Sequence, residues 1–232
     1  MKFSFRLAAV SAALVLGSVS AHADLTIPFS SFQANSVQKF TADNLASFDL
    51  VGLTVEGRGN TYVAQPGTPG ETNGTVTPVA FGFPITKIVI GSKLNIASGS
   101  AVGSALYFAR SDDDTGEALG FTLANFTINY NTKQVLADLT VKGGTVQVQT
   151  PLYNFNIATP LALKYKFPLT VTGHEVLDQL KLTEGVKSVF YSALRLPEFV
   201  ADALNADYGT LTQDISTKLR STKISTSSYV AP

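Results

Sequence analysis

Cysteine is absent from the 232-residue chain, and histidine occurs only at His22 and His174. Without cysteine the protein has no disulfide bonds, and thiolate metal, redox and nucleophilic chemistry are excluded. The scarcity of histidine removes the commonest general acid or base. Stability must therefore come from packing, and we predict a protein that is not an enzyme.

Charged residues are also few, at 15% of the chain, whereas 45% of the residues are hydrophobic. Basic and acidic residues balance at 17 each, and the basic residues form no cluster. Nucleic acids and anionic membrane surfaces attract clustered Lys and Arg, so neither is an expected partner. The composition favours a large apolar core under a surface of Thr, Ser, Asn and Gln.

No hydrophobic run reaches the roughly 20 residues that a membrane-spanning helix needs. A shorter run at residues 7–19 follows Lys2 and Arg6 and precedes the small-residue tripeptide Ala21-His22-Ala23. This order is typical of a secretory signal peptide. We predict cleavage after Ala23 and export to the periplasm or the extracellular space, as a protein that is not integral to the membrane.

Residues 24–232 have a length that suits one large all-β domain. We predict a single β-rich domain at residues 24–220, followed by a polar tail at residues 221–232. Removing residues 1–23 leaves 15 Lys and Arg against 17 Asp and Glu, so the mature chain has a formal charge near −2.

The clearest structural signal is a β-hairpin within residues 119–148. Two runs rich in β-branched and aromatic residues flank the polar turn Asn131-Thr132-Lys133-Gln134. Pairing about that turn places six large or apolar side chains, three from each strand, on one face of the hairpin. The predicted opposite pairs are Tyr130 with Val135, Ile128 with Ala137, and Phe126 with Leu139.

The first strand of this hairpin changes phase along its length. Phe121 and Leu123 alternate out of step with Phe126 and Ile128. A one-residue slip moves side chains to the other face of a sheet, and a β-bulge corrects it. We therefore predict a bulge or twist near Ala124-Asn125.

Most other segments show strand patterns, while one segment shows helical spacing. Between residues 174 and 205, apolar residues recur every three or four positions, which predicts two short amphipathic helices with Gly185 and Pro197 near their starts. The whole is predicted to be mainly β, an antiparallel β-sandwich or flattened barrel with the helical segment over one open end or face. Strands are expected at 24–32, 50–56, 84–90, 94–96, 105–109, 161–171 and 211–216, with a long exposed loop at 65–78. The apolar spacing of Val37, Phe40, Leu45 and Phe48 also allows a short helix before the strand at 50–56.

One acidic loop is a candidate cation site. Asp112, Asp114 and Glu117 lie in the sequence DDDTGE, and their carboxylates could converge on a hard cation such as calcium. The further spaced ligands of an EF-hand loop are missing, and acidic turns before a strand are common. A structural turn is the alternative interpretation.

Two further motifs have weaker chemical meaning. Ser36-Val37-Gln38-Lys39 matches the SxxK motif of penicillin-binding enzymes, but neither SDN nor KTG follows it. His174 and Glu175 with Asp178 resemble part of a metal or acid–base cluster, although a lone histidine is more often a surface or capping residue.

An ordered set of segments resembles a family of secreted proteobacterial β-rich proteins, many of which carry a C-terminal PEP-CTERM sorting tail. The segments are FPITKIVIG, SGSAVGSALYF, ALGFTLANFTINYNTKQVLADLTVKGG and DYGTLTQDIS, and the similarity covers roughly residues 81–216. The resemblance implies a β-rich exported protein and carries over no active site. Residues 227–232, SSYVAP, contain no PEP motif and no hydrophobic anchor, which favours release or periplasmic residence over surface sorting by that route.

Three functions are compatible with these patterns. The first is a non-enzymatic envelope, surface or extracellular-matrix protein, whose partners are surface or matrix components or further copies of itself. The second is a carrier of a small apolar ligand, held in a cavity that the helical segment covers. The third is a hydrolase that uses paired carboxylates, although the sequence singles out no pair. Apart from the calcium hypothesis, no cofactor is expected.

Overall fold

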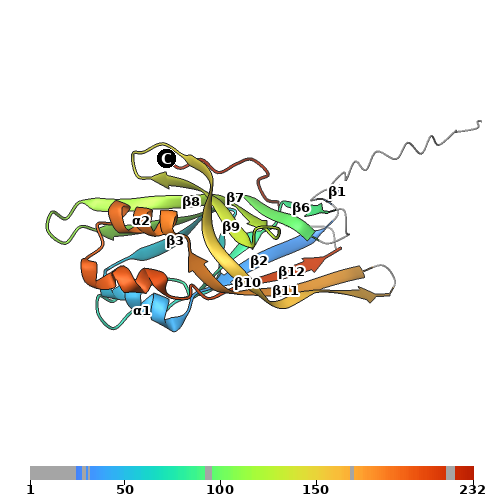
Figure 1. The fold of residues 1–232 in the computed structure, drawn as a ribbon, viewed down its shortest axis with the longest axis horizontal. Helices are drawn as coiled ribbons and strands as arrows, with labels where there is room; N and C mark the ends of the chain where they lie inside the picture. The colour runs from blue at the N-terminus through green and yellow to red at the C-terminus, as the bar shows by residue number, and fades with distance from the viewer. Residues whose placement is uncertain (1–24, 28–29, 31, 92–95, 168–169, 218–222) are drawn as a thin grey trace, which may run out of the picture.

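Twelve strands of one antiparallel sheet account for most of the part of the chain that this computed structural model describes (Figure 1). The described residues are 25–27, 30, 32–91, 96–167, 170–217 and 223–232. The predicted signal peptide lies outside them. The strands are β1 (Leu25–Ile27), β2 (Gln33–Lys39), β3 (Thr54–Gly59), β4 (Tyr62–Gln65), β5 (Ala80–Pro84), β6 (Lys87–Ile90), β7 (Ile96–Ser111), β8 (Ala118–Asn129), β9 (Gln134–Val141), β10 (Gln147–Lys166), β11 (Thr170–Leu182) and β12 (Thr210–Ser216).

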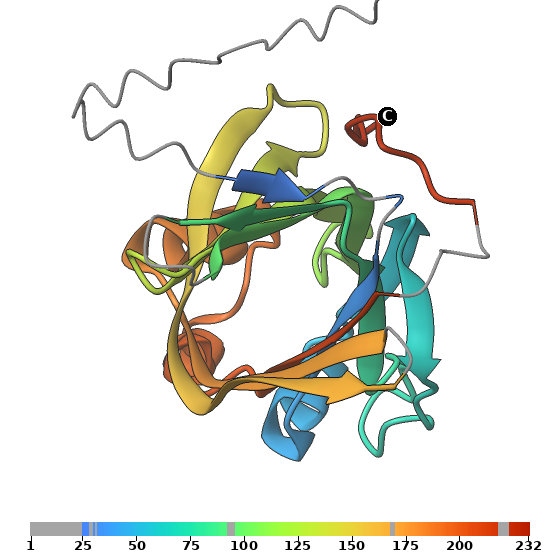
Figure 2. The ribbon, with the colours of Figure 1, turned by 90° about the vertical axis from the view of Figure 1, so that its right-hand side faces the viewer.

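The sheet curls around a common interior. Its order is β1-β6-β7-β8-β9-β10-β11-β12-β2-β5-β4, and β3 pairs with the second half of β7, beyond the part that pairs with β6. Figure 2 looks along the resulting half-barrel and shows the strands surrounding its interior. The predicted fold class, mainly antiparallel β, is confirmed.

Helices cover one end of the half-barrel, on the left in Figure 1. They are α1 (Ala42–Leu50), α2 (Glu184–Ala193) and the 3-10 helix η2 (Glu198–Asn205). Phe190 of α2 packs its ring 4.6 Å from Phe121 and 5.2 Å from Phe108, which stack on each other at 4.9 Å. Such aromatic pairs add roughly 0.5–1.5 kcal/mol each beyond their burial. The helical segment therefore closes the core at this end.

The predicted hairpin is β8–β9, and its apolar face is confirmed, but its register is wrong by two residues. Ile128 pairs with Val135 rather than with Ala137. The side-chain oxygen of Asn129 accepts the N–H groups of Asn131 and Thr132 at 3.0 and 3.2 Å, so the turn begins earlier than predicted. A shift of two leaves every side chain on its predicted face.

The predicted bulge is confirmed at Asn125. The β8–β9 pairing slips between Ala124 and Thr127, and Asn125 has a φ of 53°, in the left-handed region that asparagine tolerates. The β7–β8 pairing slips at the same level, between Ala101 and Ala105. The bulge lets the side chains on both sides of it face the same core.

The helical segment is shorter than predicted, because residues 174–182 belong to β11. Leu177 and Leu180 are both fully buried, and between them Gln179 has a φ of 50°. A bulge in a strand thus produces the three-residue spacing that the sequence pattern attributed to a helix. The predicted starts are confirmed, since α2 begins at Glu184 and η2 follows Pro197.

The strand predicted at residues 50–56 is wrong in its first half. Thr41 caps α1 by accepting the N–H of Asn44 at 3.1 Å, while the Asn44 side chain accepts the N–H of Thr41, and the helix runs to Leu50. This reciprocal capping box stabilises the start of a short helix. The strand β3 begins only at Thr54.

The segment at residues 81–90, in which one strand starting at Pro84 is predicted, holds two strands, because β5 ends at Pro84 and β6 begins at Lys87. After Pro84 the chain leaves β5, which pairs with β2 and β4, and enters β6, which pairs with β1 and β7. Conversely, the separate strands predicted around residues 96–109 form the single strand β7, with residues 94–95 outside the described part. The loop predicted at residues 65–78 is confirmed, with an isolated bridge between Pro69 and Val76.

Candidate functional site

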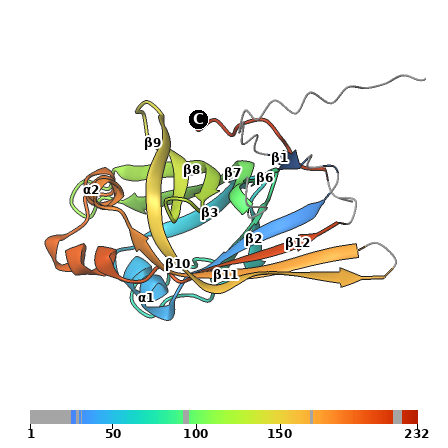
Figure 3. The same ribbon diagram turned by 45° about the vertical axis from the view of Figure 1, so that its right-hand side comes forward.

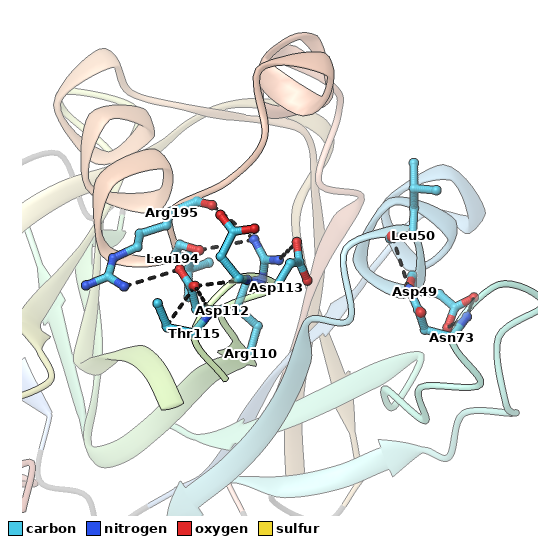
Figure 4. A network of polar contacts seen from close by, with 10 residues as sticks. Asp49, Leu50, Asn73, Arg110, Asp112, Asp113, Thr115, Leu194 and Arg195 are labelled. Atoms are coloured by element: carbon cyan, nitrogen blue, oxygen red, sulfur yellow. Dashed lines mark hydrogen bonds and ion pairs between the residues drawn. The ribbon is translucent and has the colours of Figure 1, made fainter. Parts of the chain in front are cut away.

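The acidic loop between β7 and β8 brings two of its three candidate ligands together, but around an arginine (Figure 4). Arg195 Nη1 lies 3.2 Å from Asp112 Oδ2 and 2.9 Å from Glu117 Oε2. Asp112 Oδ1 accepts the Thr115 N–H at 2.9 Å and hydroxyl at 2.8 Å, and Asp114 contributes its main-chain N–H at 3.2 Å. The hydrogen bonds from Thr115 lower the pKa of Asp112 to about 2.

This geometry gives the carboxylates a cationic partner from the protein itself. Among the described residues, no group of three His, Cys, Asp or Glu side chains is placed to hold a metal ion. A calcium ion at this loop would have to displace Arg195 from Asp112 and Glu117. Calcium binding by Asp112, Asp114 and Glu117 stays a prediction.

Next to this loop, the buried Arg110 fastens the end of α2 to the half-barrel. Its Nη1 donates to the carbonyl oxygens of Leu194 and Arg195 at 3.2 and 3.1 Å, and its Nη2 lies 2.5 Å from Asp113 Oδ2 (Figure 4). A cation is favourable at the C-terminal end of a helix, where carbonyl groups lack helical partners. The loop and Arg110 together hold the end of α2 against the half-barrel through hydrogen bonds and ion pairs.

His174, Glu175 and Asp178 do not form a cluster. His174 is exposed, and its Nδ1 lies 2.8 Å from Asp214 Oδ1 on β12, its cross-strand neighbour. Glu175 is buried on the opposite face of β11, as strand alternation requires. The histidine therefore has one carboxylate partner, from a strand that the sequence pattern did not connect with it.

The serine and the lysine of the SxxK motif also lie on opposite faces of their strand. Ser36 is buried, and its hydroxyl oxygen accepts a hydrogen bond from Gln213 Nε2 at 3.0 Å, whereas Lys39 is exposed at the end of β2. Positions three apart on a strand lie on opposite faces. The geometry that an SxxK acylation site requires is therefore not formed.

A row of polar side chains crosses the interior, and the sequence patterns did not reveal it. Glu175, Gln213 and Ser36 are cross-strand neighbours on β11, β12 and β2, and all are buried. Tyr130 donates a hydrogen bond to Glu175 Oε2. Burial raises the pKa of Glu175, and the hydrogen bond from Tyr130 opposes that rise.

The polar row continues toward the helical end. Gln38 Nε2 donates to the Tyr153 hydroxyl at 3.1 Å, and both side chains are buried. Burial raises the pKa of Tyr153, so this phenol stays protonated. One sequence signal could have revealed this row: Ser36 and Gln38 lie two and four positions after the apolar Ala34, so strand alternation places all three on the inward face.

The interior next to this row is nearly filled. A small cavity lies between apolar side chains, including Phe83, Phe126 and Leu211, and the polar groups of Gln38 and Tyr153. The space that a water-sized sphere can enter there is about 20 Å³, room for roughly one water molecule. A larger ligand would require these side chains to move.

The end opposite the helices carries an exposed aromatic feature. The β10–β11 hairpin extends past its neighbours, as Figure 3 shows at the right. Near its tip, the side chains of Tyr165 and Phe167 are 64% and 85% exposed. Exposed apolar surface that is contiguous marks interaction sites, and Tyr165 and Phe167 lie only two positions apart on this hairpin. We call Tyr165 and Phe167 the hairpin tip.

In the part of the chain that the structure describes, no helix is long and apolar enough to cross a membrane. No protein-family model matches the chain, and no curated protein sequence matches it. Among solved structures, the chain is similar to the crystal structure of the C-terminal domain of HtaA from Corynebacterium glutamicum. That similarity has a TM-score of 0.45 and 15% identity and covers 80% of this chain and 99% of that domain.

Proposed function

We propose that the protein is an exported, non-enzymatic protein of the envelope, cell surface or extracellular matrix, and that it contacts its partner through the hairpin tip. The exposure of Phe167 and Tyr165 at the end of a projecting hairpin is the observation that carries this proposal. We also propose that this chain is related to the secreted proteobacterial β-rich proteins that its sequence resembles.

The pairing of the sheet explains why this hairpin is suited to contact. The hydrogen bonds between β11 and the segment that follows β12 reach Val171, whose carbonyl accepts the Thr217 N–H at 3.0 Å, while β10 and β11 continue to pair as far as Lys166 and Thr170. The outer part of the hairpin is thus a two-stranded ribbon beyond the core. Aromatic residues on such a ribbon do not stabilise the core, which supports a role in binding.

The arrangement of titratable groups supports a non-enzymatic role. Asp112 and Glu117 pair with Arg195, and Glu175 pairs with Tyr130. The pair of His174 and Asp214 lies on the exposed face of the sheet, whereas the aspartate of a nucleophile triad is buried. These groups are used in structural pairs.

A fractionation experiment on the full chain in a proteobacterial host tests the proposal. We expect the protein outside the cytoplasm, with a mass that corresponds to cleavage after Ala23, and retained on cells or matrix. The double variant Y165S/F167S should be exported equally but released into the medium, whereas F199S, which alters an exposed aromatic on η2, should be retained. An uncleaved cytoplasmic chain would contradict the proposal.

A second candidate function is the transport of a small apolar ligand in the interior. The observation that favours it is the apolar lining of the small cavity beside Gln38 and Tyr153, because few polar groups among apolar side chains are typical of ligand sites. A ligand larger than water would have to move these side chains apart. Native mass spectrometry of protein purified from its own host should then show a bound mass that the F83W variant, which fills the cavity, lacks. Ligand-free protein in repeated preparations would remove this candidate.

A further inference from the structure

The segment at residues 223–232, called here the tail segment, lies on the outside of the half-barrel (red in Figure 2). It is attached at two points by asparagine side chains. Asn60 Nδ2 donates to the Ser225 carbonyl at 2.7 Å, and Asn60 Oδ1 accepts the Ser225 N–H at 2.9 Å. Asn125 makes the same pair of bonds with Tyr229, at 3.0 and 2.8 Å.

Both contacts recognise main chain rather than side chains. A primary amide offers a donor and an acceptor side by side, so it can bind the N–H and C=O of one residue as a neighbouring strand would. Recognition of main-chain groups is also how sheet edges bind extended peptides. The two asparagines therefore select the main-chain N–H and C=O groups of two residues four positions apart, on either side of the bend at Ser227.

Both asparagines are also held in position by bonds to residues outside the tail segment. Asn125 sits in the β8 bulge, where its Oδ1 accepts the Gly103 N–H at 3.0 Å and its Nδ2 donates to Asp138 at 2.8 Å. Asn60 Nδ2 also donates to the Val102 carbonyl at 3.1 Å. The bulges in β7 and β8 thus orient both amides toward the same surface.

Glycine at one position keeps this surface open. A Cβ atom at Gly103 would lie 3.0 Å from the Ser227 carbonyl oxygen and 3.1 Å from that of Ser225. Gly103 also has a φ of 82°, which side chains rarely adopt. A larger residue would therefore push the tail segment away.

We propose that Asn60 and Asn125 form a docking site for a peptide segment, that residues 225–229 are its tethered occupant, and that the same segment of a second copy of this chain docks there when the tethered one is displaced. The two asparagines would form the same hydrogen bonds with the chain's own tail segment and with the tail segment of a second copy. The tether gives the chain's own segment a high effective concentration, so it prevails while it is intact. The site is independent of the hairpin tip.

The first test displaces the tail segment in the full chain. The double variant S225P/Y229P lacks both N–H donors, so the side-chain amide NMR signals of Asn60 and Asn125 should move from their wild-type positions. Adding a synthetic peptide of residues 223–232 should restore them. N-methylation of the peptide at Ser225 or Tyr229 should weaken binding roughly 10-fold, since one hydrogen bond is lost, whereas N-methylation at Ser228 should not.

A complementary pair of variants tests docking between copies. The variant N60D has an intact tail segment but a damaged docking site, because an acceptor replaces the Asn60 donor. The variant S225P/Y229P has an intact docking site but a tail segment that cannot donate its two N–H groups. Mixed together, the two should form a heterodimer by analytical ultracentrifugation, while each alone stays monomeric. Unchanged Asn60 and Asn125 signals in S225P/Y229P, or equal binding of all methylated peptides, would overturn the docking site. Absence of the heterodimer would overturn docking between copies.

Discussion

A single carboxylate, that of Asp49, organises the long loop between β4 and β5. It accepts the N–H groups of Thr72 and Thr75 at 2.6 and 2.9 Å and the Thr75 hydroxyl at 2.8 Å. The Asn73 side chain donates to the Asp49 main-chain carbonyl at 2.6 Å (Figure 4). Burial raises the pKa of this carboxyl, but the hydrogen bonds outweigh burial and lower it from 3.8 to about 2. The loop is therefore ordered by one ionised residue.

This arrangement predicts acid-sensitive loop order. Because the folded pKa lies below the unfolded value, the stabilisation is complete above about pH 4 and is lost as the pH falls through 4 toward 2. The NMR shifts of Thr72 and Thr75 should follow this titration in the wild type and be independent of pH in D49N. D43N, on the exposed side of the same helix, should titrate as the wild type does.

The interior pair of Tyr130 and Glu175 predicts the opposite dependence on pH. Burial raises the pKa of Glu175, so its contribution to stability is present at low pH and is lost as the pH rises through the folded pKa. In urea unfolding, E175Q should therefore be more stable than the wild type at pH 7, and the difference should vanish toward pH 4. Equal stabilities at pH 7 would contradict this account.

The phenol of Tyr130 supplies the donor that compensates the buried carboxyl. In Y130F, Glu175 loses its hydrogen bond while it remains buried, which should cost about 1–3 kcal/mol of unfolding free energy at pH 7. Urea denaturation of Y130F and of Y130F/E175Q measures this cost. The double variant should lose less, because the amide of glutamine carries no charge to bury.

At the scale of elements, local sequence signals predicted the hairpin, its buried face, the Asn125 bulge and the starts of α2 and η2. Errors arose where a bulge altered periodicity, as at Gln179, or where side-chain capping decided the outcome, as at Thr41 and Asn129. Bulges and caps depend on single residues, whereas periodicity averages over many. Residue patterns therefore predicted element types better than their register and bounds.

The attachment of α2 gives a prediction at this scale. Replacing Arg110 with Met keeps the bulk of the buried side chain but removes its bonds to the Leu194 and Arg195 carbonyls, which should cost about 2–3 kcal/mol of unfolding free energy. R195M is the matched control and should lose much less, because that side chain is half exposed. Equal losses of unfolding free energy in the two variants would show that Arg110 is not the main attachment of α2 to the half-barrel.

At the scale of the whole molecule, composition and strand patterns predicted the fold class, but closure of the sheet depends on pairs far apart in sequence. The polar row illustrates this, because Ser36 and Gln213 become neighbours only when β2 pairs with β12. Of the candidate sites, the acidic loop was recognisable because its residues are contiguous. The polar row and the tail-segment contacts were not, since neither has a local pattern.

The central claim is that the exposed hairpin tip attaches the protein to a surface or matrix component. The most direct measurement is co-sedimentation of the purified protein without residues 1–23 with cells and matrix from its own host, compared between wild type, Y165S/F167S and F199S. We predict that the wild type and F199S sediment with this material and that Y165S/F167S, folded with an unchanged melting temperature, stays in the supernatant. Equal sedimentation of all three proteins, or of none, would contradict the claim.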